Sequence, residues 1–483
     1  GAGRMAIVTI VGTSGMTVQV TVEGARMQTL ASSYAQQILG AVATGDLSSV
    51  DLVAGGNNEP TGTNSLVQGV ITTGGAFALS GNYTNLVIGA QGGAVDGAAQ
   101  DTPVPPLSSP VTVNGAGMTG SSLSILAGNT AGVSFYAGSY DGKFVSTMGN
   151  NLFNAQGQKG DWTIATGDGD DTIIGSDGVN NIRAGDGSNL IQLGAGANFV
   201  ASEGKDTIDG VENSSDTVTI LGGNSIVNLQ SNSLIVDAAL TGSQISVGVN
   251  STIFGGTGST VNFTGSTGTI VGTVGDTISA AGDLSVYHGV NQSISVSGAL
   301  SFISGTGNTS INAGSGTIWG ANDLNVTVDT AGRALFTANQ PKTTGDQYID
   351  ASSSKGTLEA WTGAGNNTII GTSGSDHFVF GTQFADSNGD SFATVTGGSG
   401  AANTFGVLAG HNGGDITITD FGSAAGNMFF MYNYRPADAD KAIQDLLATA
   451  TVTGGNTTLQ LDNNMKVTFL GVTDLKASNI VIS

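Results

Sequence analysis

The sequence predicts an all-β fold, a parallel β-solenoid in which short strands follow one another as the turns of a coil. Three observations lead to this prediction. The chain has 483 residues, of which 78 are glycine, about twice the usual share. Its hydrophobic residues, 39% of the chain, come in short runs separated by turn residues, which is typical of many short strands. A Gly-rich segment in the middle repeats every nine residues, and a fixed repeat indicates stacked structural units.

The N-terminal part, residues 5–105, is predicted to be a β-rich domain with one amphipathic helix. Residues 5–24 alternate apolar and polar side chains on both sides of the Gly12 to Gly15 turn, as two strands would. Residues 25–48 instead carry apolar side chains at helical spacing, which predicts the helix. Four prolines between 103 and 110 favour a linker, so we expect a boundary near residue 105.

Residues 106–340 are predicted to form the solenoid, because apolar pairs recur there every eight to twelve residues. Its strongest repeats lie at 163–220. Residues 341–483 contain a second repeat patch at 362–381, an expected helix at 437–448 and a final alternation of apolar and polar residues. We expect this last part to cap the coil and to carry an export signal.

The central repeat has a fixed internal order. Its first copy, from Thr166, reads Thr-Gly-Asp-Gly-Asp-Asp-Thr-Ile-Ile, and further copies start at Gly175, Ala184 and Leu193. Glycine, an acid or amide, and a large apolar residue recur in phase. The pattern resembles the RTX (hemolysin-type) calcium-binding nonapeptide repeat, G-G-x-G-x-D-x-U-x, in which U is a large apolar residue. The second patch, 362–381, repeats it twice.

The resemblance implies a β-roll with calcium-binding turns. Glycines let the backbone curl tightly with its carbonyl oxygens inward, and the sixth-position side chain adds a hard oxygen, so that stacked turns enclose a six-oxygen Ca²⁺ cage. The eighth-position side chains would point into the roll: Ile173, Ile182, Ile191, Val200 and Ile208. The expected Ca²⁺ ligands are Gly167, Asp168, Gly169, Asp171, Asp177, Asn180, Asp186, Asn189, Asn198, Asp206, Asp216, Asn367 and Asp376.

Several of these ligands depart from the RTX pattern. Asn replaces Asp at the sixth position of four copies, and its single neutral oxygen predicts weaker calcium binding or none. The third-position residues Asp168, Asp177 and Asp186 are expected to stack nine residues apart on one edge and to restore the charge. The alternative is a solenoid without metal, in which the Asn side chains form ladders and the Asp side chains are solvated.

The charge balance excludes some partners. The chain has 36 acidic and 13 basic residues and a net charge of −23, which argues against nucleic acid and anionic membrane surfaces. It has no cysteine, and no apolar run approaches the roughly 20 residues of a membrane span. The acidic residues therefore either keep the protein soluble or collect divalent cations.

The C-terminal segments 416–421, 448–461 and 467–475 resemble the terminal region of RTX proteins exported by type I secretion. In that family an uncleaved C-terminal signal directs export. The apolar run after Met5 is too short for a signal-peptide core, which agrees with such a route. The resemblance therefore implies a secreted protein, located outside the cell or on its surface.

The function expected from these features is structural, and the protein is not expected to be an enzyme. Neither H-E-x-x-H nor G-x-S-x-G occurs, and His288, His377 and His411 lie in unrelated contexts. Acidic, cysteine-free composition with RTX repeats is similar to that of some surface-layer proteins. This implies a calcium-dependent protein that assembles with itself into a surface layer, fibre or biofilm matrix, with a surface polysaccharide as a further partner.

Three alternatives stay open. One is a polysaccharide lyase or epimerase on a β-helix, although the basic residues are scattered and aromatic residues make up only 6% of the chain. A second is a calcium-dependent adhesin that does not assemble. A third is an ice-binding face made by Thr-rich segments such as 257–269.

Overall fold

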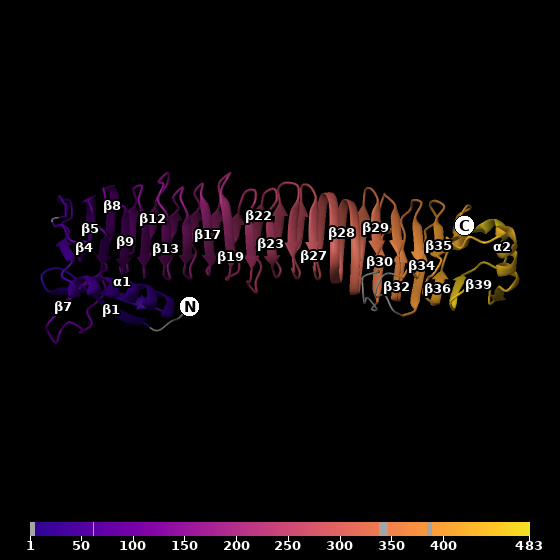
Figure 1. The fold of residues 1–483 in the computed structure, drawn as a ribbon, viewed down its shortest axis with the longest axis horizontal. Helices are drawn as coiled ribbons and strands as arrows, with labels where there is room; N and C mark the ends of the chain where they lie inside the picture. Colours follow the sequence, from indigo (N-terminus) through magenta and orange to yellow (C-terminus); the bar gives the residue numbers. More distant parts are fainter. Residues whose placement is uncertain (1–4, 61, 338–345, 384–388) are drawn as a thin grey trace. The chain divides into compact units, whose positions relative to one another are not determined.

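The computed structural model describes residues 5–60, 62–337, 346–383 and 389–483. The protein is nearly all-β, with a parallel β-solenoid of about 19 turns and 8% helix, which confirms the predicted fold class. Its contacts divide it into two compact units, unit 1 (residues 1–248) and unit 2 (residues 249–483) (Figure 1). The three-part domain division expected from the sequence stays a prediction.

Unit 1 begins with the expected strand–helix unit. Strands β1 (Met5–Val11) and β2 (Met16–Glu23) pair antiparallel, and β7 (Ala90–Ala94) pairs with the other edge of β2. The helix α1 (Ala25–Ala43) ends five residues before the predicted end. Its apolar stripe packs on β1, β2 and the outer face of the first solenoid turns (Figure 1). This packing explains the amphipathic pattern without an external partner.

A buried hydrogen bond joins α1 to the solenoid. The Tyr34 hydroxyl donates to Gln68 Oε1 at 2.8 Å, and Gln68 is fully buried. A Tyr34→Phe variant should lose about 1–2 kcal/mol of unfolding free energy, because Gln68 keeps a buried acceptor without its donor. Denaturant unfolding measures this loss. Tyr136→Phe is the control, because Tyr136 is 40% exposed, and an equal loss in both variants would contradict the prediction.

The unit 1 coil consists of two parallel sheets, and the chain alternates between them. Sheet 1a is formed by β3 (Leu47–Asp51), β4 (Leu66–Ile71), β6 (Asn85–Ile88), β9 (Ser122–Ala127), β11 (Asp141–Ser146), β13 (Trp162–Thr166), β15 (Asn180–Ala184), β17 (Ala197–Ser202), β19 (Ser215–Ile220) and β21 (Leu234–Asp237). Sheet 1b is formed by β5 (Gly75–Gly81), β8 (Val111–Met118), β10 (Val133–Tyr136), β12 (Leu152–Asn154), β14 (Thr172–Ile174), β16 (Leu190–Gln192), β18 (Thr207–Asp209), β20 (Ile226–Asn228) and β22 (Gln244–Val247).

The core of unit 1 is a thin layer between the two sheets. All five eighth-position residues of the repeats are at most 3% exposed, which confirms that they point into the coil. In the turns before the repeats the layer is filled by rings: Phe135, Phe144, Phe153 and Trp162 have centroids 4.9–6.0 Å apart. Aliphatic residues then replace the rings, so the repeats depend more on their turns for stability.

Unit 2 has the same two-sheet design. Sheet 2a is formed by β23 (Thr252–Gly255), β25 (Gly268–Val271), β27 (Leu284–Tyr287), part of β28 (Ser293–Thr330), β29 (Ala334–Thr337), β31 (Leu358–Trp361), β33 (His377–Phe380), β35 (Thr404–Leu408), β37 (Met428–Tyr432) and β41 (Ile480–Ile482). Sheet 2b is formed by β24 (Thr260–Phe263), β26 (Thr277–Ala280), the rest of β28, β30 (Gln347–Asp350), β32 (Gly365–Ile370), β34 (Ser391–Thr396), β36 (Gly414–Ile418) and β40 (Met465–Phe469). Because β28 pairs with strands of both sheets, it runs through several turns of the coil.

The C-terminal segment closes the unit 2 coil. Strand β40 pairs antiparallel with β39 (Asn456–Gln460), which pairs with β38 (Thr451–Thr453). The helix α2 (Ala439–Ala448) lies against β39 and β41, close to the range predicted for it. Two short 3₁₀ helices, η1 (Phe421–Ser423) and η2 (Ala477–Asn479), complete the segment. None of the helices among the described residues has the length and apolar character needed to cross a membrane.

Candidate metal-binding turns

Two nine-residue repeats make one turn of the unit 1 coil. Ile173 in β14 pairs with Ile191 in β16, so equivalent positions stack every 18 residues. The repeats therefore alternate between two opposite edges. Edge A consists of the turns 147–151, 167–171, 185–189 and 203–206, and edge B consists of the turns 157–161, 175–180, 193–198 and 210–216.

This register corrects one expectation. Asp168, Asp177 and Asp186 do not stack nine residues apart on one edge: Asp168 and Asp186 lie on edge A and Asp177 lies on edge B. The physical reason is that one nine-residue repeat completes only half of one turn of the coil. The charges of successive repeats are therefore separated by the width of the sheets.

Glycine is required where the turns of edge A stack closely. A Cβ atom on Gly167 would overlap the carbonyl oxygen of Thr147 in the preceding turn, and a Cβ on Gly169 would overlap that of Gly149. In the next turn, a Cβ atom on Gly187 would likewise overlap the carbonyl oxygen of Gly169. The repeated glycines thus allow close contact between turns and not only tight curvature.

The sixth-position side chains of edge A form a continuous buried ladder. Asn151 Nδ2 donates to Asp171 Oδ1 at 3.0 Å, the Asp171 main-chain N–H donates to Asn189 Oδ1 at 2.9 Å, and Asn189 Nδ2 donates to Asp206 Oδ1 at 2.8 Å. Stacked carboxylates would lie about 4.8 Å apart and repel each other. The amides between them donate hydrogen bonds instead, so the alternation of Asn and Asp has a structural reason.

The carboxyls in this ladder are buried, not solvated. Asp171 is 1% exposed, and its Oδ2 has no hydrogen-bond partner. Burial raises the pKa of Asp171, although the hydrogen bonds from Asn151 oppose the rise. Burial also raises the pKa of Asp206, whose Oδ2 accepts a 2.7 Å hydrogen bond from Ser202 Oγ. The Asn ladder expected for a metal-free solenoid is present, but the sixth-position Asp residues, which that alternative expected to be solvated, are buried.

The sixth-position side chains of edge B form a second ladder, which contains two amides and one carboxyl group. Asn180 Nδ2 donates to Asn198 Oδ1 at 2.9 Å, and Asn198 Nδ2 donates to Asp216 Oδ1 at 2.8 Å. Ser214 Oγ donates to the other oxygen of Asp216 at 2.9 Å. Burial raises the pKa of this carboxyl as well. Edge B therefore offers a cation fewer charged oxygens than edge A.

The third-position acids lie at the tips of the turns. Asp168 and Asp177 are exposed and Asp186 is half-buried. Asp177 Oδ1 accepts a hydrogen bond from the main-chain N–H of Ala195 in the next turn. Asp170, which was not predicted as a ligand, likewise accepts a hydrogen bond through its Oδ1 from the main-chain N–H of Ser188 at 2.8 Å. Its position next to Asp171 in the first repeat was the sequence signal for it.

A guanidinium group also lies at edge A. Arg26, in the first turn of α1, donates from Nη2 to the Thr166 carbonyl at 3.2 Å, and its Nε lies 4.0 Å from Glu203 Oε1. Arg183 pairs with the same Glu203. Burial lowers the pKa of Arg26, while Glu203 and Asp168 raise it. No local sequence pattern connects residue 26 with the repeats, so only the tertiary structure reveals that the positively charged Arg26 side chain lies at edge A.

The second repeat patch places its two candidate residues differently. Asp376 Oδ1 accepts from the Leu358 N–H at 2.8 Å and from Thr372 Oγ1 at 2.7 Å, and Oδ2 accepts from the Thr372 N–H at 2.7 Å. Burial raises the pKa of Asp376 despite these donors. Asn367 is 3% exposed, and neither atom of its amide has a hydrogen-bond partner.

In the part of the chain that the structure describes, no three His, Asp or Glu side chains gather as a metal site. A Ca²⁺ site in these turns would need backbone carbonyls among its ligands, as the RTX resemblance implies. No model of a known protein family matches the chain, and no curated protein matches it. Membership of the RTX family stays a prediction.

The buried carboxyls predict an unusual pH dependence in chelator. Raised folded-state pKa values mean that the folded protein binds protons more tightly than the unfolded chain. Their contribution to stability is therefore present below the ordinary Asp pKa of 3.8 and is lost as pH rises through the raised values. We expect a lower thermal unfolding midpoint at pH 7 than near pH 4. An unchanged pH slope in an Asp171→Asn, Asp206→Asn variant would show that other groups cause it.

Proposed function

We propose that this protein is a calcium-dependent extracellular structural protein that assembles with itself into a cell-surface layer, a fibre or a biofilm matrix. The proposal is supported chiefly by four buried carboxyls in the turns of the two repeat patches, Asp171, Asp206, Asp216 and Asp376. Burying a charged group without a counter-charge is costly. A divalent cation at these turns supplies that counter-charge and stabilises the coil.

Edge A is the preferred place for the cation. The turn 167–171 combines the unpartnered Oδ2 of Asp171 with the exposed carboxylates of Asp168 and Asp170 and with closely packed backbone carbonyls. All of these are hard oxygen ligands, which Ca²⁺ accepts in flexible geometry, whereas Mg²⁺ demands a near-ideal octahedron. Calcium binding would then be coupled to folding of the repeats.

The sheet faces of unit 2 favour self-association. No charged residue occurs between positions 238 and 275. On the first three strands of sheet 2b the row of outward side chains Thr260, Thr277 and Ser293 is small and neutral. On sheet 2a, Phe254 and Trp319 are 45% and 44% exposed. Such faces can lie against another copy without desolvating a charge. The net charge of −23 opposes association, and bound calcium reduces that repulsion.

A location outside the cell agrees with this chemistry. A chain whose repeats are less stable without calcium can be exported unfolded and fold where calcium is plentiful. We propose type I secretion through the C-terminal region as the route, and no catalytic residue is assigned. The enzyme and adhesin alternatives differ from this proposal in that neither requires the protein to form large particles.

The proposal is tested by titrating calcium into protein purified in chelator, with circular dichroism and light scattering recorded together. A rise in β-signal with growing particles, seen as sheets or fibres by electron microscopy, is the expected result. The same concentration of magnesium is the control. A rise in β-signal without particles would contradict self-assembly, and no response in either signal would contradict the calcium sites.

A further inference from the structure

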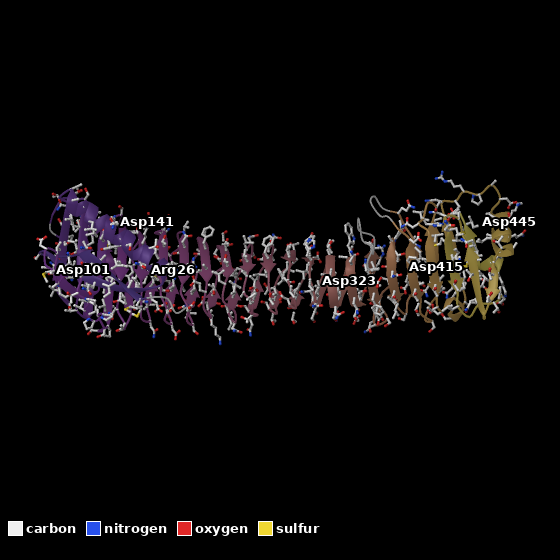
Figure 2. The ribbon with its side chains drawn as sticks, turned by 90° about the horizontal axis from the view of Figure 1, so that it is seen from below. Arg26, Asp101, Asp141, Asp323, Asp415 and Asp445 are labelled. Carbon is white, nitrogen blue, oxygen red and sulfur yellow. The ribbon has the colours of Figure 1, made fainter. Side chains whose placement is uncertain are left out.

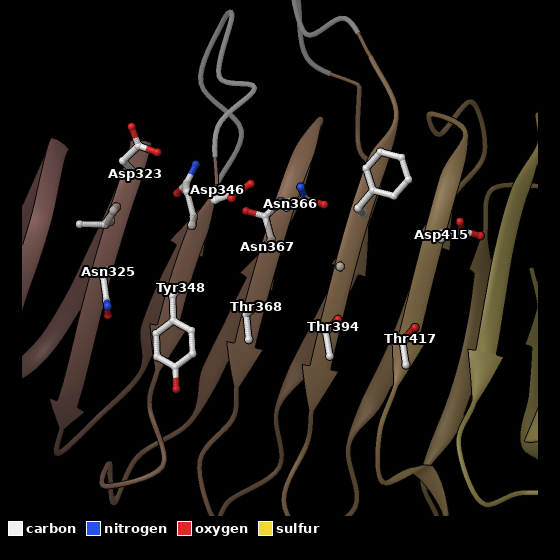
Figure 3. A pocket seen from close by; sticks show the side chains of 14 residues that line it. Asp323, Asn325, Asp346, Tyr348, Asn366, Asn367, Thr368, Thr394, Asp415 and Thr417 are labelled. Carbon is white, nitrogen blue, oxygen red and sulfur yellow. The ribbon is translucent and has the colours of Figure 1, made fainter.

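Sheet 2b contains a shallow pocket far in sequence from the unit 1 repeats. It has a volume of about 630 Å³ and extends across β28, β30, β32, β34 and β36 (Figure 3). Five strands at about 4.8 Å spacing span about 19 Å. Asp323 and Asp415, at its two ends, lie along the same stretch of unit 2 (Figure 2). The pocket is therefore an elongated hollow across the strands.

Two rows of outward side chains line this pocket. In the register of the sheet, the first row is Asp323, Asp346, Asn366, Phe392 and Asp415. The second row, two residues further along each strand, is Asn325, Tyr348, Thr368, Thr394 and Thr417. Each row thus contains one aromatic ring among carboxylate, amide or hydroxyl groups.

We propose that this pocket binds a neutral polysaccharide chain lying across the strands. Tyr348 on β30 and Phe392 on β34 are two strand spacings apart across the sheet and two residues apart along it, about 12 Å on the diagonal. Their rings can pack against the apolar C–H faces of sugar rings. The carboxylates of the first row accept hydrogen bonds from sugar hydroxyls. The Thr and Asn side chains of the second row both donate and accept.

The charge of the pocket selects the kind of glycan. Among the residues that the structure describes, three carboxylates and no lysine or arginine line it; the exposed Lys466 lies opposite Asp415 on the next strand, β40. Anionic sugars such as uronates would therefore be repelled. This distinguishes the pocket from the site of a uronate lyase or epimerase, which needs basic groups. The inference uses none of the four buried carboxyls, so it does not depend on the calcium or assembly proposals.

Electrophoresis of the native full-length protein tests the inference, in gels that contain soluble neutral glucan, mannan or galactan, or polygalacturonate. Each gel is run both with calcium and with chelator, so that assembly in calcium cannot be mistaken for binding or hide it. We expect at least one neutral polymer to retard the protein at least twofold more than polygalacturonate does. A Tyr348→Ala, Phe392→Ala variant should lose this retardation. The matched control is a Phe254→Ala, Tyr287→Ala variant, which removes exposed rings from sheet 2a.

Two outcomes would overturn the inference. One is that no neutral polymer retards the wild-type protein. The other is that retardation survives in the Tyr348→Ala, Phe392→Ala variant, or falls only when Asp323, Asp346 and Asp415 are changed to Asn, which indicates a purely electrostatic effect. Circular dichroism of each variant confirms that loss of retardation does not reflect unfolding.

Discussion

An Asp171→Asn, Asp206→Asn variant is expected to unfold in chelator at a higher temperature than the wild-type protein and to gain little from calcium. Both carboxyls are buried in the edge A ladder, and burial raises their pKa values. Asn keeps the oxygen that accepts from Asn151 or Asn189 and removes the buried charge. The same change removes the oxygens that a cation needs.

Calcium should stabilise the wild-type protein much more than it stabilises the Asp171→Asn, Asp206→Asn variant. A ligand present at 100 times its Kd stabilises the folded state by about 2.7 kcal/mol per site. We expect about that gain for the wild-type protein and less than about 1 kcal/mol for the double variant. Thermal unfolding in chelator and in calcium measures both values. An Asp170→Asn variant changes an exposed acid of the same turn and should leave the stability in chelator close to wild type.

Two results would contradict this prediction. If the double variant is less stable than wild type in chelator, the ladder needs its carboxylates even without metal. If calcium stabilises wild type and double variant equally, the ions bind elsewhere. The outcome therefore distinguishes a calcium β-roll from a solenoid held only by its polar ladders.

A Gly187→Ala variant is expected to lose about 3 kcal/mol or more of unfolding free energy. Gly187 has a φ of 114°, which side-chain-bearing residues rarely adopt. An added Cβ would also overlap the carbonyl of Gly169 in the preceding turn. Because that obstacle is backbone, no side-chain rotation relieves it, and the turns of edge A must separate.

Denaturant unfolding followed by circular dichroism measures the loss. The matched control is Gly157→Ala in edge B, where φ is 74° but an added Cβ would meet no atom within 4 Å. It should cost only about 1–2 kcal/mol, the strain of a left-handed residue. Equal losses in the two variants would show that close stacking of the turns is not what the repeat glycines provide.

Much of the fold could be predicted from local sequence. The alternation in residues 5–24 predicted β1 and β2, the helical spacing after Ala25 predicted α1, and the inward residues of the repeats were placed correctly. Each of these patterns reflects which side of a strand or helix is buried, and that information is local. The helix end was less certain, because fraying and tertiary contact decide it.

The candidate site was predicted less completely. The sixth positions were correctly singled out, but they are buried ladder members, and Asp168 and Asp177 lie on opposite edges. A nine-residue period gives the spacing of repeats and not how many complete one turn. Arg26 at edge A could not be foreseen, because 140 residues separate it from its partner Thr166.

The sequence by itself determined the strand-rich coil, its glycine turns and its inward apolar residues, because these follow from short-range periodicity and backbone sterics. The tertiary structure alone decided the 18-residue register, the burial of Asp171 and the row of acids and rings in the unit 2 pocket. Those features depend on which strands become neighbours across one turn. That choice is made by the packing of the whole coil, not by any one segment.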